Sequence, residues 1–295
     1  MRRAVLILFL LALAPLAARA DKPEGPVDAI GMLDYHRGPH FKVGDWVKYH
    51  TQGTSAQGFK TDYTVTVLIA GEELWWGEEC FWIETHASYG GKVPELAASL
   101  LSYAVFQDTL PARDFQKYMR KYIDGLDEHG KPLEQLFLRA PAELITRGFD
   151  YDEPARTTDT VGVEKVEVPK GTFDALKDIQ KWRETTNKQE GDSTLYFEKA
   201  ETHTRWWSNQ VPITSLVRID QHNTQRQRTW MIGESANAPL LTIEEAVGST
   251  MLVDFGTGMK SKLIPERFQR SLAQQGAAPK PPARAPVRKP ATTRS

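Results

Sequence analysis

Residues 59–69 read Phe-Lys-Thr-Asp-Tyr-Thr-Val-Thr-Val-Leu-Ile and carry the clearest structural signal in the chain. Apolar and polar side chains alternate along this stretch, and several of them are β-branched. A period of two with β-branched residues is typical of a strand that buries one face. We therefore predict a half-buried strand with Tyr63, Val65 and Val67 on its buried face.

The segments around this stretch extend the prediction to a sheet. Residues 41–49 and 78–87 are rich in aromatic and β-branched residues, and the connections between the three segments are short. Short connections favour an antiparallel meander. Strand patterns resume near residue 159 and continue to Phe255. The sequence thus predicts one β-rich domain over residues 41–275.

Residues 94–147 have a different pattern and predict a helical insertion. Aromatic and apolar residues there follow the i, i+3, i+4, i+7 spacing of an amphipathic helix. The members of this stripe are Phe115, Tyr118, Met119 and Tyr122. Because a helix must bury its apolar stripe against another element, we expect these helices to lie across one face of the sheet. The predicted fold class is therefore α+β, mainly antiparallel β, with a mid-chain block of amphipathic helices.

The first twenty residues have the pattern of a cleavable signal peptide. Two arginines precede an apolar run that ends at Leu16, and alanines stand at positions 18 and 20. The run is shorter than the roughly 20 residues that span a bilayer. No cysteine follows the expected cleavage site, so lipid attachment is not expected there. We expect a periplasmic or secreted protein that is not integral to a membrane, with residues 21–40 as an irregular lead-in.

Basic residues gather at the C-terminus. The chain holds 37 Lys and Arg against 38 Asp and Glu, and residues 276–295 contain basic residues but no acid. The body that precedes them is therefore acidic, which argues against nucleic-acid binding. Pro and Ala dominate residues 276–295, which predicts a disordered tail. The composition favours a solvated spacer, and contact of the basic tail with an anionic envelope surface is the alternative.

No catalytic, metal or cofactor motif stands out. The Gly-x-Ser-x-Gly signature of serine hydrolases is absent. His36 and His40 have helical spacing, but Gly38 and Pro39 lie between them and oppose a helix that would align them on a metal. The single cysteine, Cys80, lies in an apolar stretch and is expected to be a core residue. The sequence predicts a protein without enzymatic activity or cofactor; a hydrolase with an unrecognised site is the least supported alternative.

Two segments of the second half resemble an uncharacterised group of exported Gram-negative proteins. They are Val166-Glu-Val-Pro-Lys-Gly-Thr-Phe173 and Arg205-Trp-Trp-Ser-Asn-Gln-Val-Pro-Ile213, within residues 160–233. That group is similar in fold to the LolA/LolB-like periplasmic lipoprotein carriers and acceptors. The resemblance implies a curved, incomplete antiparallel β-barrel with the helices over its concave, apolar face. Ala175-Leu176 departs from the usual residues that follow the Phe, which bears on the ligand rather than on the fold.

A curved sheet with helices across it forms a mouth, and such mouths hold apolar ligands. Tryptophan suits a boundary between water and an apolar region, because it has an apolar body and one N–H donor, although packing in the core is the default for most of the eight Trp residues. The leading hypothesis is a carrier of an apolar ligand, such as a lipid or a lipoprotein acyl chain. The alternative is a structural or interaction protein of the cell envelope with a filled core. The predicted ligand-binding residues are Tyr63, Val65, Val67, Phe115, Tyr118, Met119, Tyr122 and Trp207.

Overall fold

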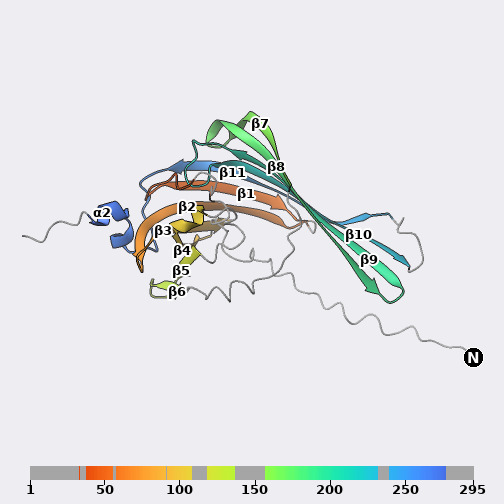
Figure 1. Cartoon of the computed structure of the whole chain (residues 1–295), viewed down its shortest axis with the longest axis horizontal. Helices are drawn as coiled ribbons and strands as arrows, with labels where there is room; N and C mark the ends of the chain where they lie inside the picture. Colours follow the sequence, from red (N-terminus) through yellow and green to blue (C-terminus); the bar gives the residue numbers. More distant parts are fainter. Residues whose placement is uncertain are drawn as a thin grey trace, which may run out of the picture.

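The computed structural model describes residues 33, 38–55, 58–90, 92–107, 118–136, 157–231 and 239–276. Within these ranges nearly all regular structure is antiparallel β-sheet (Figure 1). The strands are β1 (Trp46–Thr54), β2 (Lys60–Trp75), β3 (Glu78–Tyr89), β4 (Glu95–Ser102), β5 (Met119–Leu126), β6 (Pro132–Leu136), β7 (Thr157–Val168), β8 (Gly171–Glu190), β9 (Ser193–Trp207), β10 (Leu216–Met231) and β11 (Leu241–Gly256). The short helical elements are η1 (Tyr103–Gln107), η4 (Glu266–Phe268) and α2 (Leu272–Gly276).

The described strands form one open sheet in the order β6-β5-β4-β3-β2-β1-β11-β10-β9-β8-β7. Strands β1 to β6 form one meander and β7 to β11 form another, since strands that follow one another in the chain are neighbours in the sheet. The antiparallel pairing of β1 with β11 joins the two meanders. Because β6 and β7 are the two edges and do not pair with each other, the sheet is not closed into a barrel.

The two meanders differ in shape. Figure 1 shows β1 to β5 curving across one end of the molecule, whereas β8, β9 and β10 continue as a twisted arm that projects away from it. Strand length accounts for the arm, because β8 has 20 residues and β4 has 8. The outer part of β8, residues 181–189, is almost entirely exposed. At the other end of this meander β7 contacts β10 and β11, with which it does not pair, so the sheet coils over itself there.

The predicted mid-chain block of helices over a concave face is wrong. Residues 95–102, 119–126 and 132–136 are strands, and η1 is the helical element in the described part of residues 94–147. Residues 108–117 and 137–156 of the predicted insertion lie outside the described residues. In β4 the six residues from Ala97 to Ser102 are all buried. A strand that is buried on both faces has no alternation of apolar and polar residues, so the periodicity of its sequence does not indicate a strand.

A β-bulge explains why β5 has helical spacing. Leu101 of β4 pairs with Met119, and Ser99 pairs with Tyr122, so two steps along β4 correspond to three steps along β5. The extra residue is Arg120, and it shifts the alternation of side chains by one position. Met119 and Tyr122 therefore point to the same face although they are three residues apart, which is also the spacing of a helix face.

The strand predicted at residues 59–69 is confirmed as the first part of β2, with Val65, Val67 and Ile69 buried. The alternation ends at Leu68, where both faces become buried. Val67 and Ile69 belong to the larger of two hydrophobic clusters, and Leu68 to the smaller. In β1 to β5 the larger cluster lies on one face of the sheet, which is the apolar face below. The smaller is covered by residues 257–276, the closing segment, which contributes Leu263 and other apolar side chains.

Candidate functional site

The apolar face brings together the predicted ligand-binding residues that the structure describes. Each belongs to the larger hydrophobic cluster or packs against it: Tyr63, Val65, Val67, Tyr118, Met119, Tyr122 and Trp207. The eighth, Phe115, lies outside the described residues. The register of the sheet accounts for this grouping, since Phe81, Leu101 and Met119 stand opposite one another across β3, β4 and β5. The residues are thus grouped by strands rather than by a helical lid.

The centre of the apolar face is a packed core. Val65 is 1% exposed, and Val67, Phe81 and Tyr49 are 0% exposed. The Tyr49 hydroxyl donates a hydrogen bond to the Leu216 carbonyl oxygen at 2.7 Å. Burial raises the pKa of Tyr49, so the hydroxyl stays protonated. Val65 and Val67 therefore serve as core residues, and any ligand contact falls on the side chains around them.

Half-buried side chains pack against this centre, and most of them are aromatic. They are Phe41, Tyr63, Tyr103, Phe106, Tyr118, Tyr122, Trp207, Ile219, Met251 and Phe255. These ten residues are the aromatic border. A half-buried aromatic ring offers a large apolar surface, and Tyr and Trp keep a polar group at the water boundary. The border is therefore the part of the apolar face that is suited to an apolar ligand.

Three border rings gather over Phe81. The Phe81 ring centroid lies 4.9 Å from that of Tyr103, 5.1 Å from that of Phe41 and 5.7 Å from that of Phe106. Tyr103 and Phe106 come from η1, which places both next to the sheet. The Tyr103 hydroxyl donates to a Glu72 carboxylate oxygen at 2.9 Å. Burial, with the negative charge of Glu72, raises the pKa of Tyr103. In this aromatic group the Phe81 ring is buried, and the rings of Phe41, Tyr103 and Phe106 around it are half-buried.

Trp207 is held in place by polar partners. Its indole Nε1 donates to Asp178 Oδ2 at 2.9 Å, and Arg205 Nε donates to the same carboxylate at 2.8 Å. The Arg205 guanidinium also lies 5.2 Å from the Trp207 ring centroid, within range of a cation–π contact. The ring is therefore fixed at the border rather than free to rotate.

The opposite face is closed by residues 257–276, and Glu84 anchors this segment. Glu84 is 0% exposed and accepts hydrogen bonds from the Lys262 N–H at 3.0 Å and the Leu263 N–H at 3.4 Å. Its carboxylate also accepts from the Ser261 hydroxyl and lies 2.6 Å from His86 Nε2. Burial by itself would raise the pKa of Glu84, but the hydrogen bonds from His86, Ser261 and Lys262 outweigh it and lower that pKa.

Cys80 lies beside buried charges on this second face. Lys121 Nζ pairs with a Glu73 carboxylate oxygen at 2.8 Å, and Trp82 Nε1 donates to the other at 3.0 Å. Burial, followed by the charge of Glu78, raises the pKa of the Cys80 thiol to about 12. A thiol of that pKa is protonated near neutral pH and is a poor nucleophile. Cys80 is 0% exposed, so the prediction that it is a core residue is confirmed.

One serine and one histidine approach each other as in a hydrolase, but the serine is enclosed. Ser215 Oγ lies 3.1 Å from His40 Nε2, and His40 Nδ1 lies 3.1 Å from the Gly38 carbonyl oxygen. Ser215 is 1% exposed, so a substrate cannot reach its hydroxyl in this conformation. Among the described residues, no three His, Cys, Asp or Glu side chains are placed to share a metal ion. No helix in those ranges is long and apolar enough to cross a membrane.

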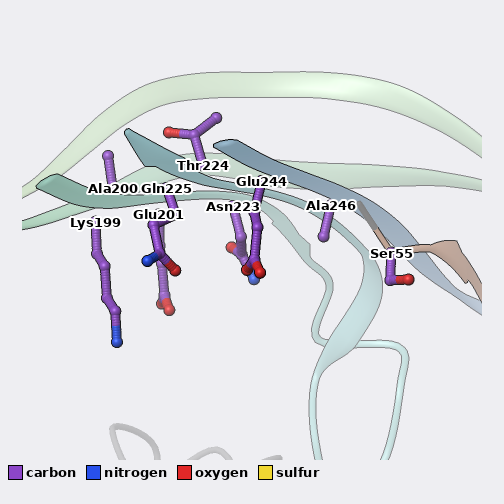
Figure 2. A pocket seen from close by; sticks show the side chains of 9 residues that line it. All are labelled: Ser55, Lys199, Ala200, Glu201, Asn223, Thr224, Gln225, Glu244 and Ala246. Carbon is purple, nitrogen blue, oxygen red and sulfur yellow. The ribbon is translucent and has the colours of Figure 1, made fainter. Parts of the chain in front are cut away.

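A separate pocket of about 300 Å³ lies on β9, β10 and β11 where the arm begins (Figure 2). None of the seven predicted ligand-binding residues that the structure describes lines it. Most of its lining residues are of polar types, among them Lys199, Glu201, Asn223 and Glu244. In the sequence each of these residues is a single polar position within a strand, and they do not belong to a common local motif. Cross-strand register brings these residues together, so no pattern within a single strand indicates the pocket.

The chain matches no family model and no curated protein. Among solved structures it is similar to a proposed lipoprotein from Parabacteroides distasonis, with 13% identity and a TM-score of 0.30 over 74% of this chain and 97% of that chain. It is also similar to a proposed exported protein with a YmcC-like fold from Bacteroides fragilis, with 12% identity and a TM-score of 0.29 over 75% of this chain and 98% of that chain.

A third similar structure is a LolA superfamily protein from Nitrosomonas europaea, with 10% identity and a TM-score of 0.25 over 82% of this chain and 97% of that chain. The solved structures to which the chain is similar therefore include a LolA superfamily protein, at low identity. At these TM-scores the ligand must be inferred from the apolar face of this chain.

Proposed function

We propose that this chain is an exported, non-enzymatic binding protein that holds an apolar ligand against its aromatic border. The ligand class is an acyl chain, carried by a lipid or a lipoprotein. The observation that carries the proposal is the border itself, in which eight of ten half-buried side chains are aromatic and share one face of an open sheet. Large apolar patches on soluble proteins usually mark a binding surface. Export is inferred from the N-terminal signal pattern.

The packed centre sets how such a ligand would bind. Because Val67 and Phe81 fill the middle of the face, an acyl chain would lie over the border rather than inside a deep cavity. Burying about ten methylene groups contributes roughly 8 kcal/mol, from which the entropy of immobilising the chain is subtracted. We therefore expect reversible binding in the micromolar range or weaker.

The second candidate function is a structural or interaction protein of the cell envelope that holds no ligand. The arm favours this alternative, because residues 181–189 of β8 are almost all exposed and no part of the described core packs on them. The filled centre of the apolar face agrees with it as well. In this alternative the border only completes the core.

Binding of the apolar dye N-phenyl-1-naphthylamine, and its displacement by palmitate, tests the proposal. Phe106→Ser and Tyr122→Ser each remove one border ring, and Trp76→Ser removes an aromatic side chain that is 76% exposed in the β2–β3 turn. We expect each border variant to weaken dye binding about tenfold, which corresponds to roughly 1.4 kcal/mol, and Trp76→Ser to have no effect. Equal dye binding in all three variants, or none in the wild type, would favour the second candidate function.

A further inference from the structure

Three neighbouring strands present two rows of side chains to one side of the sheet where the arm begins. The residues that stand opposite one another on β9, β10 and β11 are Glu201, Asn223 and Ala246 in one row, and Lys199, Gln225 and Glu244 in the next. The pocket of about 300 Å³ lies over these rows. Figure 2 shows Lys199, Glu201, Asn223 and Glu244 pointing to the same side of the strands, while Thr224 points to the other.

Small residues make the hollow. Ala246 ends one row, and Gly248 stands two residues further along β11, opposite Gln221 of β10. A Cβ added to Gly248 would make ordinary van der Waals contacts, at 3.7 Å with the Gln52 carbonyl oxygen and at 3.8 Å with Gln221 Oε1, and glycine itself leaves that volume unfilled. The longer side chains of Lys199, Glu201 and Glu244 project from the strands around these small residues. One water molecule occupies about 30 Å³ in the liquid, so the pocket has room for a small organic molecule.

Several polar groups of the pocket have no partner among the described residues. Asn223 Oδ1 is buried and accepts no hydrogen bond among the described residues. The described part of the chain also provides no hydrogen bond or ion pair to the side chains of Lys199, Gln225 and Glu244. Buried acceptors in folded proteins are nearly always satisfied, because leaving one unsatisfied is destabilising. A ligand that donates to Asn223 would satisfy this oxygen.

The charges of the pocket are arranged along the strand-to-strand direction. Lys199 on β9 and Glu244 on β11 stand at the two ends of one row, about 10 Å apart at the backbone because strands are about 4.8 Å apart. Asn223 stands next to Glu244 on the diagonal and supplies a further acceptor at the negative end. Glu201 lies 3.8 Å from His203, which provides it with a neighbour outside the row.

We propose that this pocket binds a small zwitterion, with a primary ammonium group at Asn223 and Glu244 and an anionic group at Lys199. A primary ammonium has three N–H donors, and the amide oxygen and the carboxylate offer three acceptor oxygens. A simple cation would be repelled by Lys199, and a simple anion by Glu244. A calcium ion needs six to eight oxygen ligands, more than these side chains supply. This site is independent of the aromatic border.

The test uses three probes in nuclear magnetic resonance titrations of the full chain: 2-aminoethyl phosphate, ethanolamine and ethyl phosphate. We expect 2-aminoethyl phosphate to shift the Asn223 side-chain amide resonance and to bind at least about tenfold more tightly than either single-charge probe, since each lost charge-assisted contact weakens binding by about that factor. Equal affinity for all three probes, or no binding of 2-aminoethyl phosphate, would overturn the proposal.

Matched variants assign the effect to the pocket. Glu244→Gln and Lys199→Met should each weaken binding of 2-aminoethyl phosphate about tenfold, and Ala246→Leu should abolish it by filling the hollow. Glu167→Gln, which changes an exposed carboxylate on β7, is the control and should bind as the wild type does. Unchanged affinity in both Glu244→Gln and Lys199→Met would overturn the assignment even if Ala246→Leu does not fold.

The same zwitterion exists free in solution and as a lipid headgroup. Sedimentation with vesicles of phosphatidylethanolamine, compared with phosphatidylglycerol vesicles, separates these two sources. If the chain sediments with phosphatidylethanolamine vesicles alone, and Glu244→Gln abolishes this sedimentation, the result supports the proposed pocket and identifies its ligand as a lipid headgroup. Binding of soluble 2-aminoethyl phosphate without sedimentation supports the pocket and identifies a free ligand. If the chain sediments with either kind of vesicle and Glu244→Gln leaves this sedimentation unchanged, the pocket does not contribute to vesicle binding.

Discussion

Replacing Glu84 with Gln should loosen the segment that closes the second face of the sheet. The Glu84 carboxylate accepts hydrogen bonds from the N–H groups of Lys262 and Leu263 at 3.0 and 3.4 Å, and it also bonds to Ser261 and His86. A glutamine side chain of the same shape has one acceptor oxygen, and its NH₂ group would face donors. Glu84→Gln therefore removes both the charge and part of the hydrogen bonding.

The structure sets the size of the effect. Glu84 is 0% exposed, so water cannot replace the lost hydrogen bonds. A hydrogen bond to a charged group contributes about 1.5–3 kcal/mol, and a buried donor left without an acceptor costs about 1–3 kcal/mol. Removing one partner from a buried charged network costs about 3–5 kcal/mol, and we expect a loss in that range at neutral pH.

The pH dependence gives a second readout. Because its hydrogen bonds lower the pKa of Glu84, the folded pKa lies below the unfolded one. The stability that Glu84 contributes is therefore fully present above the unfolded pKa, about 4.3. That stability is lost as the pH falls through the folded pKa. The Glu84→Gln chain lacks this titration and should lose less stability than the wild type on acidification.

Urea unfolding, followed by tryptophan fluorescence at about pH 7 and about pH 4, measures both effects. Glu79→Gln is the matched control, because Glu79 lies on the same strand and is exposed. This control should unfold with the same free energy as the wild type within about 0.5 kcal/mol. Equal unfolding free energies for the wild type and Glu84→Gln at neutral pH would refute the view that Glu84 anchors residues 257–276.

Three further experiments test other parts of the fold. Gly71→Ala would place a Cβ 2.0 Å from the Phe268 carbonyl oxygen, so thermal melting should report a loss of about 1–3 kcal/mol, and an unchanged melting temperature would contradict this packing. The Cys80 thiol, with its pKa raised to about 12 by burial, should react with Ellman's reagent only after unfolding in urea; rapid reaction of the folded protein would contradict its burial. A chain ending at Gly276 should melt within about 2 °C of the full chain, since surface changes are usually within about 0.5 kcal/mol, and a larger loss would mean that the tail docks on the body.

The sequence predicts the sheet best where one strand face is polar. Thr64 and Thr66 alternate with Val65 and Val67, and this pattern identified the first part of β2 correctly. The pattern fails where a second layer covers the strand. Residues 97–102 of β4 are buried on both faces, so their sequence carries apolar residues without a period of two.

The two candidate sites differ in what a sequence can reveal. Residues of the aromatic border can be placed on a common face, because alternation along each strand reports which side chains share a face. Met119 and Tyr122 were grouped correctly although their element was assigned wrongly, since a bulge and a helix both bring residues three apart to one face. The polar pocket depends on Lys199 standing opposite Gln225, a register that no local pattern encodes.

The central claim is that the aromatic border binds an acyl chain, and native mass spectrometry of the protein tests this claim most directly. Protein purified from its own cell envelope should carry an added mass equal to a fatty acid or a lipid. Phe106→Ser should lose this adduct, while Trp76→Ser, which alters an exposed turn, should keep it. A bare chain mass in every preparation, and no adduct after incubation of the wild type with palmitate, would contradict the claim.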